Sequence, residues 1–224
     1  TRRALSSTKV MTNWAVRQFA QDWLDRHPDV TPDGWDSREL LEPSSDDGTR
    51  TFDDEGDVGV LRTWRAMCPE LQERWPEDEQ PEDWEGVTIE NGRVVELELE
   101  DFGLTGAVPA EIGRLSALRA LSLDSNQLTS LPAEIGQLRS LEWLNLRGNQ
   151  LTSLPAEIGQ LTSLTELYLH SNQLTSLPAE IGQLTSLREL VLFENQLTSL
   201  PAAIREFRAA GCEVYMDDGV TFDE

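Results

Sequence analysis

Acidic side chains at alternating positions are the first feature of this sequence that could do chemistry. Asp53, Glu55 and Asp57 have the odd-numbered spacing with which a calcium-binding loop supplies its carboxylates. Such a loop also needs a glycine at its sixth position, where Val58 stands, and a glutamate at its twelfth, where none occurs. We therefore expect no calcium site here, and no other residue cluster predicts a metal site.

Candidate catalytic groups are few and scattered. The two histidines, His27 and His170, are far apart and have no serine or cysteine partner at a recognisable spacing, so no nucleophilic triad is indicated. The sequence has no glycine-rich phosphate loop, because the recurring Ile-Gly-Gln belongs to a repeat turn. We expect no catalytic residues, no cofactor and no enzymatic activity.

The two cysteines, Cys68 and Cys212, form no metal-ligand spacing and are predicted to be buried thiols in a reducing compartment. The absence of an Asn-x-Ser/Thr sequon is in keeping with this, and no apolar run approaches the length of a membrane span. We expect a cytoplasmic protein without direct membrane insertion. Alternatively, the Arg- and Ser-containing segment 2–8 is the remnant of a processed leader, and the protein lies inside an organelle.

The formal net charge of −23 restricts the class of partner. Nucleic acids and anionic membrane surfaces are polyanions, so neither is expected to bind. A basic partner is compatible with this charge, and so is the simpler interpretation that the acidic residues keep the protein soluble.

The elements that must position any site come from an internal repeat. The segment Leu-Thr-Ser-Leu-Pro-Ala-Glu-Ile-Gly-Gln-Leu starts at Leu128, Leu151 and Leu174, a period of 23 residues, and decayed copies start at Leu104 and Leu197. Within each period, alternating leucines predict a short strand with one apolar face. One repeat cannot bury its own leucines, so neighbouring repeats must stack. The predicted fold is an α/β solenoid with a parallel sheet on its concave face.

Each predicted strand is followed by an asparagine, whose amide can satisfy the backbone groups of neighbouring turns. This structural ladder comprises Asn126, Asn149, Asn172 and Asn195. On the return side, Leu131, Ile135 and Leu138 predict a single helical turn after Pro132.

This spacing, over residues 94–216, resembles the leucine-rich repeat superfamily. The 23-residue form with Leu-Pro-x-x-Ile-x-x-Leu is similar to the intracellular typical class, which includes plant Ras-group-related, Shoc2-like and Scribble-like proteins. The first repeat, Leu104-Thr-Gly-Ala-Val-Pro, and the segment that begins at Trp84 resemble the first repeat and N-terminal cap of plant receptors. The paired cysteines of that receptor cap are missing here.

The chain before the repeats carries six of the seven tryptophans, so it is not a solvated tail. These residues are Trp14, Trp23, Trp35, Trp64, Trp75 and Trp84. An amphipathic stripe predicts a helix over 12–26, and a second helix is predicted over 58–67 with a further turn at 71–75. Segment 42–56 is rich in Asp, Ser and Gly and is typical of a loop or linker.

A solenoid end exposes its apolar interior and therefore needs a cap. We expect the tryptophans between 64 and 84 to form the core of such a cap over a first strand at 95–99. After the last repeat, Cys212, Val214 and Met216 resume the strand alternation. The predicted organisation is a helical extension with an acidic linker at 1–57, an N-terminal cap at 58–92, about five leucine-rich repeats at 93–209 and a C-terminal cap at 210–224.

The candidate binding residues flank the strand leucines, point to the concave surface and differ between repeats that are otherwise nearly identical. An acidic end at Glu96, Glu98, Glu100 and Asp101 gives way to an aromatic-rich group. Aromatic and arginine side chains dominate interface energetics, although surface drift between duplicated repeats would also produce this variation. The predicted partner-binding residues are Trp143, Asn145, Arg147, Tyr168, His170, Val191 and Phe193, with Tyr215 as a possible extension.

These observations predict a non-catalytic protein-interaction module, of the scaffold kind, that binds a protein or peptide on its concave face. One alternative is an accessory structural subunit of a large, possibly organellar, multi-subunit assembly, bound through the N-terminal tryptophans. A weaker alternative is an extracellular ligand-sensing domain similar to those of plant receptors.

Overall fold

A computed structural model describes residues 56–223 of the chain. The helix predicted over 12–26, the tryptophans at positions 14, 23 and 35, and most of the acidic linker lie outside these residues. Asp53, Glu55 and His27 also lie outside them.

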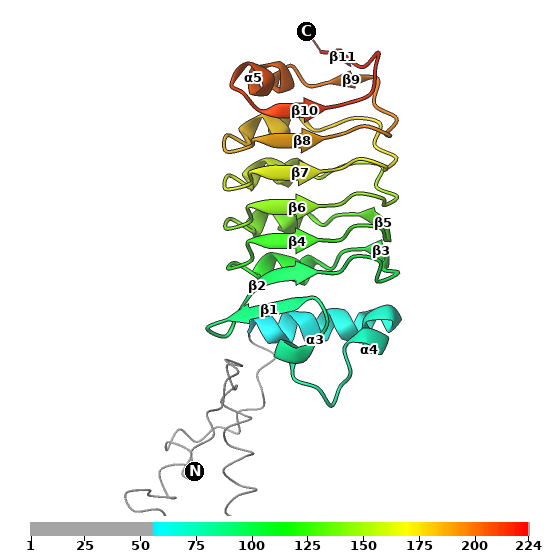
Figure 1. Cartoon of the computed structure of the whole chain (residues 1–224), viewed down its shortest axis with the longest axis vertical. Helices are drawn as coiled ribbons and strands as arrows, with labels where there is room; N and C mark the ends of the chain where they lie inside the picture. Colours follow the sequence, from blue (N-terminus) through cyan, green and yellow to red (C-terminus); the bar gives the residue numbers. More distant parts are fainter. Residues whose placement is uncertain (1–55, 224) are drawn as a thin grey trace, which may run out of the picture. The chain divides into compact units, whose positions relative to one another are not determined.

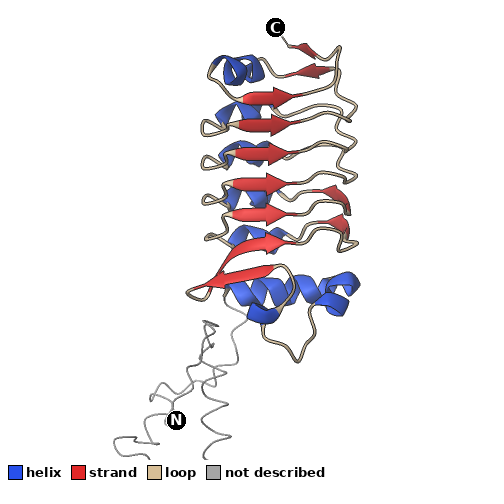
Figure 2. Cartoon of the chain, in the orientation of Figure 1, coloured by secondary structure: helices blue, strands red, loops and turns tan. Residues whose placement is uncertain are grey.

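A seven-stranded sheet runs through the repeats (Figures 1 and 2). Six of its strands are parallel, and β1 pairs with β2 in the antiparallel sense. In spatial order the strands are β1 (Val87–Glu90), β2 (Arg93–Glu98), β4 (Ala120–Ser122), β6 (Trp143–Asn145), β7 (Glu166–Tyr168), β8 (Glu189–Val191) and β10 (Glu213–Tyr215). The structure therefore confirms a solenoid built around a mainly parallel sheet.

The strand leucines form a single core because they pair in register. Leu121 lies opposite Leu144, which lies opposite Leu167 and then Leu190, and all four are fully buried. Burial of one leucine side chain stabilises the fold by about 1.5–3 kcal/mol, and each repeat contributes several such residues. The stacking of repeats is therefore the main source of stability.

A short 3₁₀ helix returns the chain behind the sheet in each repeat (Figure 2). These helices are η2 (Ala110–Arg114), η3 (Ala133–Gln137), η4 (Ala156–Gln160) and η5 (Ala179–Gln183). Of these, η3 corresponds to the helical turn that was predicted after Pro132. Their glycines are needed for close stacking. A Cβ at Gly159 would lie 2.2 Å from the carbonyl oxygen of Glu180 in the next repeat. Arg205, which occupies the same repeat position in α5 (Ala203–Ala209), is exposed.

The side chains of the ladder asparagines hydrogen-bond with the backbone of neighbouring repeats. The Asn149 side-chain amide donates to the carbonyl oxygens of Leu123 at 2.8 Å and of Leu146 and Arg147 at 3.1 Å. Its Oδ1 accepts a hydrogen bond from the Leu128 amide at 2.9 Å. Leu123 and Leu128 belong to the preceding repeat, so each asparagine ties two repeats together.

Two helices and the predicted cap tryptophans close the N-terminal end of the described chain. Helix α3 spans Asp57–Met67 and α4 spans Pro69–Arg74, followed by the 3₁₀ turn η1 (Pro81–Asp83). Trp64, Trp75 and Trp84 are all buried, and the rings of Trp75 and Trp84 stack with centroids 5.0 Å apart. The three tryptophans therefore belong to the hydrophobic core of the described chain.

A hairpin that was not predicted from the sequence joins this cap to the repeats. Asn91 and Gly92 both adopt positive φ, at 52° and 76°, and turn β1 back onto β2. An Asn-Gly pair between apolar alternations is a strong hairpin signal, because its backbone matches the twist of the strands. Consequently the first repeat strand begins at Arg93 instead of Val95 and has an antiparallel neighbour.

Asp57, which the sequence analysis placed in the acidic linker, is the first residue of α3 and is buried with 7% of its surface exposed. Its Oδ2 accepts hydrogen bonds from the Arg93 side chain and the Val94 amide, both at 2.9 Å. This carboxylate therefore fixes α3 to β2, the first strand of the repeats.

At the C-terminal end, β10 adds the last strand of the main sheet, as the alternation of Cys212, Val214 and Met216 predicted. Two-stranded parallel sheets flank the solenoid and pair β3 (Thr105–Ala107) with β5 (Gln127–Ser130), and β9 (Ser199–Leu200) with β11 (Thr221–Phe222). None of the helices between residues 56 and 223 has the length and apolar character needed to cross a membrane.

Candidate functional site

The solvent-facing side of the seven-stranded sheet, here called the outer sheet face, carries the residues predicted for the concave surface. Strand register aligns them in columns. The first column is Glu96, Ala120, Trp143, Glu166, Glu189 and Glu213, and the second is Glu98, Ser122, Asn145, Tyr168, Val191 and Tyr215. Backbone hydrogen bonds beyond the strand ends, such as Gly148 N to His170 O at 3.1 Å, continue the ladder into a third column that contains Arg147, His170 and Phe193.

Four of the predicted residues form a continuous aromatic cluster, namely Trp143, Tyr168, His170 and Phe193. Ring centroids are separated by 6.1 Å between Trp143 and Tyr168, 6.4 Å between Tyr168 and His170, and 4.5 Å between His170 and Phe193. All four side chains are half-buried, so their rings support one another and still present surface to solvent. These separations are typical of favourable aromatic pairs.

Val191 does not belong to the accessible surface, contrary to the prediction. It is only 5% exposed because register places it between Tyr168 and Tyr215 on the adjacent strands. Large rings on both sides cover a small branched side chain. Val191 therefore supports the two tyrosines.

Asn145 and Arg147 lie beside the cluster but are partly engaged within the protein. The Asn145 Oδ1 accepts a hydrogen bond from the Arg147 backbone amide at 3.1 Å. The Arg147 guanidinium lies 4.0 Å from the buried Asp124 carboxylate, yet it remains mostly exposed. Arg147 is thus available to a partner, whereas the Asn145 side-chain oxygen already accepts a hydrogen bond within the turn.

The Tyr168 hydroxyl donates a hydrogen bond to Glu166 at 2.9 Å. Burial raises the pKa of this hydroxyl, and the hydrogen bond to Glu166 and the negative charges of Glu166 and Glu189 raise it further. Tyr168 is therefore a neutral hydrogen-bond donor throughout the physiological pH range.

The surroundings of His170 favour its neutral form. Burial lowers its pKa, and the positive charge of Arg147 acts in the same direction, while Asp124 and Glu194 oppose the shift. Its Nδ1 is a buried side-chain atom without a hydrogen-bond partner within the described residues. Since buried polar atoms normally have partners, this nitrogen is an exception among the described residues.

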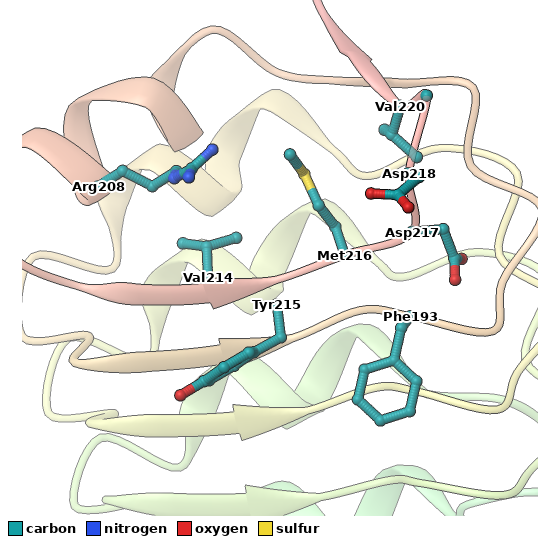
Figure 3. A pocket seen from close by; sticks show the side chains of 9 residues that line it. Phe193, Arg208, Val214, Tyr215, Met216, Asp217, Asp218 and Val220 are labelled. Carbon is teal, nitrogen blue, oxygen red and sulfur yellow. The ribbon is translucent and has the colours of Figure 1, made fainter.

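The structure brings three further residues next to the cluster, Glu166, Glu189 and Glu213, which the predicted binding residues did not include. It also makes Tyr215, predicted as a possible extension, a member of the face. Tyr215 is 47% exposed, and its hydroxyl donates to Glu213 at 2.7 Å. Tyr215 and Phe193 line a pocket at the C-terminal end of the face, together with the side chains labelled in Figure 3. The 23-residue period, extended through the extra residue in the last repeat, was the signal that could have identified the three glutamates.

The two cysteines are buried free thiols, as predicted. Burial raises the pKa of both, and the Cys68 thiol donates to Glu70 at 3.1 Å, which raises its pKa further. Protonated, buried thiols are poor nucleophiles. Among residues 56–223 no group of three or more His, Cys, Asp or Glu side chains is arranged to hold a metal ion.

Comparisons with known proteins agree with this architecture. The family described as "Leucine-rich repeat region" matches residues 90–209. The LRR receptor-like serine/threonine-protein kinase FEI 2 of Arabidopsis thaliana is 39% identical over 72 residues, which cover 31% of this chain and 10% of the kinase. The chain thus matches only about a tenth of that relative's length.

Solved structures show the same relationship. The BIR2 ectodomain from Arabidopsis thaliana has a TM-score of 0.62 at 26% identity, over 75% of this chain and 95% of that one. A second similar structure is the ectodomain of the Arabidopsis thaliana receptor kinase GASSHO1/SCHENGEN3 in complex with CASPARIAN STRIP INTEGRITY FACTOR 2. Its TM-score is 0.63 at 29% identity, and the match covers 72% of this chain and 21% of that one. Since the family match covers more than half of the chain and the repeats stack as described, the protein belongs to the leucine-rich repeat family.

Proposed function

We propose that this chain is a non-catalytic interaction module whose outer sheet face binds a protein or peptide, with the aromatic cluster at the centre of the site. The observation that carries the proposal is the continuous contact of Trp143, Tyr168, His170 and Phe193 on a solvent-facing sheet. Rigid aromatic side chains lose little entropy on binding and bury much area, so they commonly dominate interface energies. The comparisons support a protein or peptide as partner, because similar ectodomains are solved with such ligands.

The repeats contribute to this site in two ways. Their invariant leucines and asparagines hold the strands in fixed register, and the variable residues between them are therefore displayed at fixed positions. Binding energy is then not spent on ordering the site, which favours affinity.

Capture of partners by the full chain tests the proposal. Trp143→Ala and Phe193→Ala should each weaken binding by about 2 kcal/mol or more if they are central contacts. Glu134→Ala and Glu157→Ala lie on the 3₁₀ helices behind the sheet and should leave binding unchanged. A photo-crosslinking residue at position 145 should trap the same partner, whereas one at position 134 should not.

Loss of partners on mutation behind the sheet, with retention after Trp143→Ala, would place the site elsewhere. That result would favour the accessory-subunit alternative, with its contacts among the residues before position 56. Three tryptophans on which that alternative relied, at positions 64, 75 and 84, are buried in the cap and cannot serve as contacts without unfolding it.

We further propose that the protein belongs to the intracellular class of these repeats and acts in the cytoplasm or an organelle interior. The buried free thiols Cys68 and Cys212 and the 23-residue period support this location. The likeness to receptor ectodomains favours the second candidate, an extracellular ligand sensor. Fractionation of cells that express the full tagged chain separates the two: recovery in the secreted or surface fraction would favour the sensor.

A further inference from the structure

Three glutamates form a row along the edge of the aromatic cluster. Glu189 lies directly opposite Glu166 on one side and Glu213 on the other. Neighbouring strands are about 4.8 Å apart, so the three carboxylates, here called the carboxylate row, are close in space. Like charges directly opposite each other destabilise a sheet. The row therefore contributes a local repulsion that a cation would relieve.

No cation within the described residues neutralises this row. The ion pairs found there join Arg74 to Glu85, Arg93 to Asp57, Arg119 to Glu90, and Arg147 to Asp124. The contacts of the row are instead the Tyr168 hydroxyl on Glu166 and the Tyr215 hydroxyl on Glu213. The row is thus held in place by neutral donors, and no described residue forms an ion pair with it.

The same two tyrosines place aromatic rings beside the carboxylates. A guanidinium or ammonium group is attracted to the face of an aromatic ring within about 6 Å and is attracted more strongly to a carboxylate. The stem of a long basic side chain also packs on apolar surface while its head stays polar. Carboxylate and ring together are therefore complementary to arginine and lysine side chains.

The surroundings of the row extend this negative charge. Asp217 and Asp218 line the pocket next to Tyr215, where Arg208 is the basic residue (Figure 3). Glu96 and Glu98 begin the same two columns at the other end of the sheet, and the chain carries a net charge of −23. Such a distribution attracts a basic partner over a distance and accelerates its association.

We propose that the occupant of the outer sheet face is an extended polypeptide segment rich in arginine or lysine, whose cationic heads contact the carboxylate row and whose stems lie on Tyr168 and Tyr215. This inference rests on the proposed function, since it names the chemistry of the partner at the same site. The row spans three strands, so a segment that crosses the strands can place more than one basic side chain on it.

A labelled (Arg-Ser)₆ peptide tests the inference when its binding to the full chain is followed by fluorescence anisotropy at physiological salt. The variant Glu166→Gln/Glu189→Gln/Glu213→Gln should bind it about tenfold more weakly. The matched variant Glu111→Gln/Glu134→Gln/Glu157→Gln removes the same charge from the 3₁₀ helices behind the sheet and should lose less than about twofold. Tyr215→Ala should weaken binding by about threefold or more, since it removes an exposed ring beside the row.

Equal losses for the two triple variants would overturn the inference, because they would show attraction to net charge alone. Tighter binding of (Glu-Ser)₆ than of (Arg-Ser)₆ would also overturn it. The proposed function can fail separately. If Trp143→Ala abolishes partner capture while the carboxylate-row variant retains both the partner and the peptide, the interaction site stands and its basic specificity does not.

Discussion

The tryptophans of the N-terminal cap and the aromatic cluster of the outer sheet face differ in what surrounds them. Trp75 is fully buried, stacks on Trp84 and donates its indole N–H to the Glu85 carbonyl at 2.9 Å. Trp143 is half-buried, and its ring packs against the Tyr168 ring in a tilted arrangement. Aromatic residues therefore stabilise the fold at one end of the chain and remain available for recognition on the sheet.

The largest expected effect comes from the cap. Trp75→Ala should lower the free energy of unfolding by about 3–5 kcal/mol, because it empties a fully buried site and removes the ring on which Trp84 stacks. Chemical denaturation followed by circular dichroism measures this loss. A decrease below about 1 kcal/mol would show that the cap is not integral to the solenoid.

Asn149→Leu should also destabilise the protein although it adds apolar volume. The carbonyls of Leu123 and Leu146 and the amide of Leu128 would lose a partner, and each orphaned buried group costs about 1–3 kcal/mol. Gln150→Ala, at the exposed neighbouring position, is the control and should change stability by less than about 0.5 kcal/mol. Comparable thermal unfolding of the two variants would contradict the role of the ladder.

Asp57→Ala tests the link between the cap helix α3 and strand β2. The buried Val94 amide would lose its acceptor, so we expect a loss of about 1–3 kcal/mol. Asp78→Ala, at an exposed position, serves as the matched control. Hydrogen exchange should show faster opening of α3 and β2 in the first variant alone, and equal exchange in both would remove Asp57 from this role.

A smaller effect concerns pH. Folding lowers the pKa of His170, so below about pH 6.5 the unfolded chain takes up a proton that the folded chain resists. Stability should therefore fall as pH drops through 6.5, and His170→Gln should reduce this fall. Arg147→Gln should raise the His170 pKa in an NMR titration, because it removes a nearby positive charge. An unchanged titration would separate Arg147 from this effect.

The smallest expected effect sharpens the comparison most. Trp143→Ala should change the free energy of unfolding by less than about 1 kcal/mol, because the ring lies outside the core. The same denaturation experiment used for Trp75→Ala provides the measurement. A loss equal to that of Trp75→Ala would mean that the aromatic cluster is a structural element and not a binding site.

Much of the fold could be predicted because the spacing of leucines and asparagines within the repeat determines how the repeats stack. Leu144 and Asn149 recur at a constant spacing, and the only arrangement that buries the leucines and pairs the turn amides is a stack. The 3₁₀ turns and the buried cap tryptophans followed from the same reasoning. The β1 hairpin was missed although Asn91-Gly92 signals it, since the segment was interpreted only as a family-type cap.

The site was predicted less completely. The repeat spacing correctly predicted which residues lie beside Trp143 on the adjacent strands. The accessibility of a side chain also depends on the size of its neighbours on those strands, which is why Val191 is covered. The row of Glu166, Glu189 and Glu213 crosses three repeats and includes one residue after an irregular step in the period. Its members are far apart in the chain and meet only through the strand register.

The amino-acid sequence by itself determined the repeat, its period, the residues of the core and the turns, and the column in which each variable residue stands. These properties depend on local spacing, which the chain carries directly. Only the tertiary structure decided that Asp57 ties the cap to the sheet, and that the carboxylate row stands beside two tyrosine rings. It alone also decided that, among residues 56–223, the His170 Nδ1 has no hydrogen-bond partner and the row has no ion-pair partner. Those properties depend on burial and on distances between repeats, and they exist only once the strands are stacked.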